Sequence, residues 1–100
     1  MSQAVIVYWR DIPAQVIVGR GRTAEKRELP RRFIEAIDRA AMRVGAKDTE
    51  AYLAQWRRGD AGAIEGEPKA VADRMAAAIE ATYDDARLAQ LVAGDGYDKA

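Results

Sequence analysis

Two short runs of β-branched and aromatic residues lie close together near the N-terminus, and they constrain the fold more than any other feature. The first run covers residues 4–10 (AVIVYWR) and the second covers residues 15–19 (QVIVG). Such residues favour strands. The intervening Asp11-Ile12-Pro13-Ala14 predicts a turn, because proline fixes its own φ and biases the residue before it away from helix. A connection this short predicts an antiparallel hairpin.

The segment after residue 28 has helical spacing. Leu29-Pro30 predicts a helix start, and Gly45 predicts its end. Apolar residues recur between these points at the spacing of one helix face: Phe33, Ile37, Ala40, Ala41 and Val44. A second, shorter helix is expected after a cap at Asp48, with Tyr52, Leu53 and Trp56 on its buried side.

The C-terminal part predicts one long helix. It begins at Pro68, is rich in alanine, and is expected to continue to Gly94, with a frayed tail over 95–100. A third strand is expected around Ala63-Ile64-Glu65. The sequence therefore predicts an α+β fold in a single domain over residues 1–100. We expect a small antiparallel sheet, the N-terminal hairpin plus this third strand, packed with three helices in the order ββαα(β)α.

The composition excludes several kinds of catalytic and metal site. The 100 residues include no Cys and no His, and Ser occurs only as Ser2. Disulfides, thiolate nucleophiles, thiolate-bound metals and a Ser–His–Asp triad are therefore excluded, and the commonest general base and transition-metal ligand is missing. We expect a protein that is not an enzyme, with no catalytic residues, no cofactor and no metal.

The charges predict little affinity for nucleic acid but leave one alternative open. The net charge is zero, which argues against a dedicated nucleic-acid binder. The loop over residues 19–32 is nevertheless rich in basic residues, and it could bind an anion or nucleic acid. Its candidate anion-binding residues are Arg20, Arg22, Arg27 and Arg31. The alternative is a solvated loop, because Glu25 and Glu28 interrupt the cluster.

The best candidates for a protein interface lie in and beside the hairpin. They are Tyr8, Trp9, Arg10 and Asp11; an exposed aromatic can anchor a partner, whereas the charged pair could equally stabilise the turn. Both faces of the hairpin are apolar: one carries Val5, Val7 and Trp9, and the other carries Ala4, Ile6 and Tyr8. If helices cover only one face, we expect a homodimer or a protein partner on the other, with Tyr8 or Trp9 near the centre of the contact. Alternatively, helices cover both faces.

No targeting segment and no stretch of membrane-spanning length is visible in the sequence. We therefore expect a cytoplasmic protein that does not contact a membrane.

The run Val7-Tyr8-Trp9-Arg10-Asp11-Ile12-Pro13-Ala14-Gln15-Val16 resembles the opening of the small bacterial virulence factor domain family. The resemblance continues through 29–33, 36–42, 52–57 and 66–68, and so covers nearly the whole chain. The family name comes from a larger staphylococcal protein that contains the domain, and it defines no biochemical activity. The resemblance implies a bacterial accessory protein, associated with corrinoid and folate one-carbon enzymes.

Overall fold

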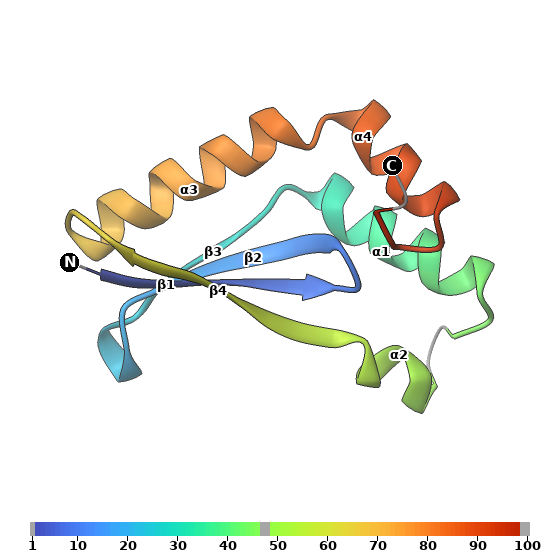
Figure 1. Ribbon diagram of the computed structural model, residues 1–100, viewed down its shortest axis with the longest axis horizontal. Helices are drawn as coiled ribbons and strands as arrows, with labels where there is room; N and C mark the ends of the chain where they lie inside the picture. Colours follow the sequence, from blue (N-terminus) through green and yellow to red (C-terminus); the bar gives the residue numbers. More distant parts are fainter. Residues whose placement is uncertain (1, 47–48, 99–100) are drawn as a thin grey trace.

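The computed structural model, which describes residues 2–46 and 49–98, contains a four-stranded antiparallel sheet with helices packed on it (Figure 1). Its strands are β1 (Ser2–Trp9), β2 (Ile12–Val18), β3 (Glu25–Glu28) and β4 (Trp56–Ile64), in the spatial order β3-β2-β1-β4. Its helices are α1 (Arg31–Arg43), α2 (Glu50–Ala54), α3 (Pro68–Thr82) and α4 (Asp85–Ala93), with a 3-10 turn, η1 (Gly21–Thr23). The α+β class is confirmed, and so is the order of the predicted elements. The structure adds β3 and divides the last helix in two.

The N-terminal hairpin is confirmed, but its turn is tighter than the sequence predicts. Only Arg10 and Asp11 separate the two strands, and Arg10 adopts a positive φ of 55°. Pro13 lies inside β2 next to a bulge at Ala14, where the register of β1 and β2 shifts. Because β3 pairs with β2 only from Gln15 onward, the proline's missing N–H is not needed for that ladder.

Two edge strands flank the hairpin, and both were predicted incompletely. The segment expected to be a loop contains β3, which pairs with β2. The expected third strand is much longer than residues 63–65, because β4 begins at Trp56. Its glycines and charged residues have low strand propensity, so the sequence does not predict this strand. It is extended because it pairs with β1 along its length.

Helix α1 ends as predicted. Its buried residues include Phe33 and Ile37, while Val44 lies just beyond the helix and is exposed. Gly45 has a φ of +68°, its N–H donates to the Met42 carbonyl, and the Ala46 N–H donates to the Ala41 carbonyl. This is the Schellman arrangement, in which a left-handed residue satisfies the last carbonyls of a helix.

Helix α2 differs from its prediction both in the residues that it contains and in which of them are buried. Asp48, the predicted cap, lies outside the described residues; the Thr49 hydroxyl accepts a hydrogen bond from the Tyr52 N–H. Leu53 is 67% exposed rather than buried. Trp56 belongs to β4, so the spacing that suggested one helical face actually spans a helix and a strand.

The long C-terminal helix is interrupted after Thr82. Asp84 accepts a hydrogen bond from the Arg87 N–H and so begins α4 as a separate helix. Helix α3 covers one sheet face, where Val71 and Ala72 pack on Ala4, Val16 and Val18. Helices α1 and α4 pack together beyond the hairpin end (Figure 1). None of the helices in the described part of the chain is long and apolar enough to cross a membrane.

Within residues 2–46 and 49–98, no helix runs along the opposite face of the sheet, which α1 meets only at the hairpin end (Figure 1). The strand register places Val5, Val7 and Ile17 on this side, and all three are half-buried. We call this surface the open face. Polar residues surround the apolar ones: Gln3, Gln15, Lys26, Glu28, Arg58 and Asp60. The expectation of one poorly covered face holds along Val5, Val7 and Ile17. At the hairpin end, however, Trp9 and Ile12 lie on the same side by register and share a buried core cluster with α1.

Candidate functional site

The four predicted interface residues at the hairpin turn have different environments. Trp9 has no exposed surface, and its indole N–H donates to the Tyr52 carbonyl at 2.9 Å. It therefore belongs to the core and cannot lie at the centre of a surface contact. Tyr8 is half-buried on the side of the sheet that carries α3; it packs over Gly59, and the Arg57 guanidinium lies 4.3 Å from its ring centroid.

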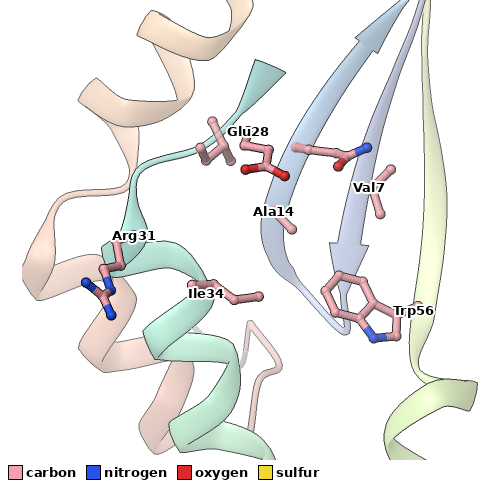
Figure 2. Close-up of a pocket in the computed structure, with 8 residues that line it drawn as sticks. Val7, Ala14, Glu28, Arg31, Ile34 and Trp56 are labelled. Carbon is pink, nitrogen blue, oxygen red and sulfur yellow. The ribbon is translucent and has the colours of Figure 1, made fainter. Parts of the chain in front are cut away.

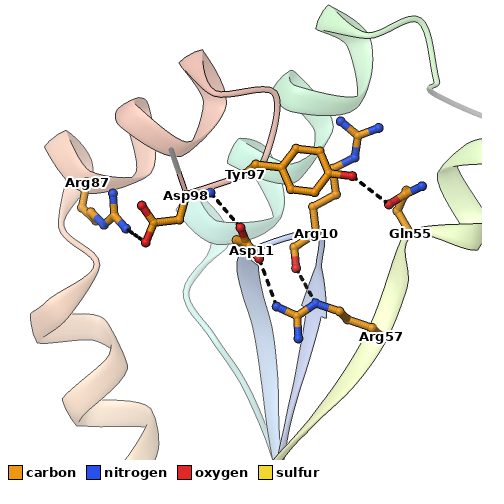
Figure 3. Close-up of polar contacts among 7 residues, drawn as sticks. All are labelled: Arg10, Asp11, Gln55, Arg57, Arg87, Tyr97 and Asp98. Carbon is orange, nitrogen blue, oxygen red and sulfur yellow. Dashed lines mark hydrogen bonds and ion pairs between the residues drawn. The ribbon is translucent and has the colours of Figure 1, made fainter. Parts of the chain in front are cut away.

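Arg10 and Asp11 connect the turn to the C-terminal segment (Figure 3). The Arg10 guanidinium lies 4.7 Å from the Tyr97 ring centroid and donates to the Asp95 carbonyl at 2.6 Å. The Asp11 carboxylate accepts hydrogen bonds from Arg57 at 3.1 Å and from the Asp98 N–H at 2.7 Å. The predicted frayed tail is thus wrong for residues 95–98. Arg10 and Asp11 attach this segment to the hairpin turn, and their role at a protein interface stays a prediction.

A polar pocket of about 320 Å³ opens beside this turn. It is lined by Tyr8, Asp11, Arg57, Tyr83, Arg87 and Asp98. Two ion pairs span it, Arg57 with Asp11 at 3.1 Å and Arg87 with Asp98 at 2.8 Å. Burial raises the pKa of Tyr83 above its ordinary value; Tyr8, Asp98 and Asp11 add to the effect, and Arg87 opposes it. Because its arginines are already matched by carboxylates, the pocket has no net charge with which to attract an anion.

The four candidate anion-binding residues do not form one site. Arg27 pairs with Asp73 at 2.7 Å and with Glu25 at 3.0 Å. Arg31 pairs with Glu35 at 3.3 Å. Arg20 and Arg22 lie at η1, are exposed, and make no ion pair within residues 2–46 and 49–98. Of the four arginines, Arg27 and Arg31 are thus paired with carboxylates, whereas Arg20 and Arg22 are exposed to solvent.

An apolar pocket of about 390 Å³ lies where the open face meets α1 (Figure 2). Its walls are Val7, Ala14, Leu29, Ile34 and Trp56, and its polar rim is Gln15, Glu28 and Arg31. Ile34 projects from α1 toward Trp56 at the start of β4 (Figure 2). Its volume is at the small end of the range for ligand pockets, enough for one apolar side chain or a small ligand.

Of the residues that line this pocket, only Arg31 was a predicted site residue; Ile34 and Trp56 are the two most informative of those that were missed. Ile34 follows Phe33 and so falls outside the buried stripe of α1, which leaves it 42% exposed. In the sequence, this pocket could have been indicated by an apolar residue that lies outside the buried stripe of its helix. Trp56 could not be found in the same way, because only its pairing with Trp9 shows that it begins a strand.

No group of carboxylates in the described segments is arranged to hold a metal ion. The expectation that the protein binds no cofactor and no metal stays a prediction.

Comparison with protein-family models finds a match to the virulence factor family over residues 7–92. Neither the curated proteins nor the solved structures yield a match. The matched region contains the hairpin turn, α1, the apolar pocket and β4. Because it covers most of the chain, the resemblance seen in the sequence is confirmed, and the chain belongs to the virulence factor family.

Proposed function

We propose that the protein is a non-enzymatic interaction module that binds a partner protein through the open face. The observation that carries this proposal is the apolar pocket at the end of that face. Val7, Ile34 and Trp56 come from three different elements and meet around a cavity of about 390 Å³. Half-buried Val5, Val7 and Ile17 extend the apolar surface along the sheet.

The partner that fits this surface presents one apolar side chain flanked by polar groups. The pocket walls are apolar, whereas Glu28 and Arg31 place one charge of each sign at the rim. An apolar centre with a polar rim is the usual arrangement of a protein interface. The composition, without Cys or His, supports a binding role over a catalytic one.

The same arrangement supports an accessory role, in which the module attaches to a larger enzyme and does not itself carry out chemistry. The family resemblance makes corrinoid- and folate-dependent one-carbon enzymes the first partners to test.

Site-specific photocrosslinking in the source organism tests the proposal. A photoreactive residue replaces Glu28, which is exposed at the pocket rim, and a control replaces Ala77 on the exposed side of α3. We expect a discrete crosslinked protein from the rim position only. Excess wild-type protein should compete for it, and an Ile34→Glu variant, which fills the pocket with a charge, should not. Equal crosslinking from both positions, or equal competition by Ile34→Glu, would contradict the proposal.

A further inference from the structure

The two edges of the sheet differ in how well they are protected. Strand β3 is only four residues long, and all four are charged. Arg27 on this strand pairs with Asp73 of α3 at 2.7 Å. Short edge strands with charged side chains resist pairing with another chain. This edge is therefore blocked.

Strand β4 forms the opposite edge and is less protected than β3, although it carries three charged residues and a bulge at Ala61. It is nine residues long, and it pairs with β1 on one side and with no described strand on the other. Its middle is built from small residues, Gly59, Ala61, Gly62 and Ala63, with Asp60 between the first two. An exposed strand of this length presents a row of backbone donors and acceptors to any chain that can approach.

The charges on β4 are arranged so that the strand complements itself. Arg58 and Asp60 are two residues apart, so both side chains lie on the open face, beside Val7 and Val5 respectively. Within the described residues the Arg58 side chain is exposed and makes no hydrogen bond or ion pair. Asp60 is also exposed, and its carboxylate accepts hydrogen bonds from Gln3 and from the Gly62 N–H.

We propose that β4 pairs antiparallel with β4 of a second copy, around a twofold axis at Gly59. In this register each Arg58 lies directly opposite Asp60 of the other copy, on the same face of the combined sheet. Opposite charges at facing positions stabilise an antiparallel pair, and a twofold interface uses each such contact twice. The bulge in β4 at Ala61 limits the pairing at both ends, because the twofold axis repeats it and each strand bends there.

The product is a continuous eight-stranded sheet with the order β3-β2-β1-β4-β4-β1-β2-β3. Its outermost strands are the blocked β3 edges, so assembly stops at two copies. The two open faces join into one larger surface with an apolar pocket at each end. This inference goes beyond the proposed function, since the pocket can bind its partner whether or not the chain dimerises.

Reciprocal charge reversal tests the inference, with mass measured by light scattering or sedimentation over a dilution series. The wild type should dimerise with rising concentration. Arg58→Asp places two acids opposite each other, and Asp60→Arg places two bases opposite each other. Each variant alone should dimerise at least about tenfold more weakly. A mixture of the two should recover the dimer, because every facing pair is then opposite in sign. Arg22→Asp, the same change at an exposed arginine in η1, should leave dimerisation unaltered.

Three results would overturn the inference. The first is a wild type that stays monomeric at millimolar concentration. The second is a dimer that withstands both reversals, and the third is a mixture that fails to recover although circular dichroism shows both variants folded. The crosslink from the Glu28 position reports on the pocket independently, so failure of dimerisation and failure of partner binding can be told apart.

Discussion

The Asp11 carboxylate accepts a hydrogen bond from the Asp98 backbone N–H at 2.7 Å, across a separation of 87 residues. The same carboxylate accepts from Arg57 at 3.1 Å, so one side chain joins the hairpin turn, β4 and the C-terminal segment. A half-buried carboxylate with these partners contributes to stability through both contacts at once.

Asp11→Ala should therefore lower the free energy of unfolding by about 1–2 kcal/mol, since it removes two hydrogen bonds to a charged group. Urea denaturation measures this change. Glu35→Ala is the control, because it removes only an exposed pair within α1, and it should cost less than about 0.5 kcal/mol. Equal losses for both variants would show that Asp11 is only a surface charge.

Two glycines with positive φ should respond differently to alanine. A Cβ at Gly45 would meet only open space, so Gly45→Ala should cost only the backbone strain, about 1 kcal/mol. A Cβ at Gly96 would lie 2.8 Å from the Trp9 ring, so Gly96→Ala should cost about 2–4 kcal/mol. Thermal unfolding compares the two. Similar losses would mean that the C-terminal segment does not pack on Trp9.

The two tryptophans can be told apart by fluorescence. In a Trp56→Phe variant the remaining emission comes from Trp9, which is fully buried, and it should be blue-shifted and protected from acrylamide. In a Trp9→Phe variant the emission comes from half-buried Trp56, which should be quenched more strongly. If a peptide ligand for the pocket is found, only the Trp56 signal should change on binding.

Alkaline titration should single out Tyr83. Burial raises its pKa above the ordinary 10.0, so the folded state holds this proton more tightly than the unfolded state does. The resulting stability is fully present below pH 10.0 and is lost as the pH rises through the folded pKa. Spectrophotometric titration should show a late phenolate transition that Tyr83→Phe removes. Tyr97→Phe, at an exposed ring, should leave that transition in place.

The features that the sequence predicted well are those set by neighbouring residues. The hairpin follows from two β-branched runs and a short connection, and the end of α1 follows from Gly45, whose backbone conformation closes the helix. The start of α3 follows from Pro68 at its first position. The open face could also be expected, because both sides of the hairpin are apolar and few helices are available to cover them.

The features that were missed depend on contacts between distant residues. Nothing near Arg57 to Gly62 favours a strand; the segment is extended because β1 pairs with it. The segment from Asp95 to Asp98 is ordered by Arg10 and Asp11, at the other end of the chain. The apolar pocket requires Ile34 and Trp56 to meet from separate elements, which local spacing cannot reveal.

The central position of β1 also determines the order in which the sheet can form. Its partner on one side, β2, follows after a two-residue turn, whereas its partner on the other side, β4, begins only at Trp56. During synthesis the hairpin can therefore form long before β4 is available, and it then exposes an unpaired apolar strand. Pairings between distant segments are slow to form, and unpaired strand edges promote aggregation. The interval before β4 arrives is thus the stage at which this chain most needs protection from its neighbours.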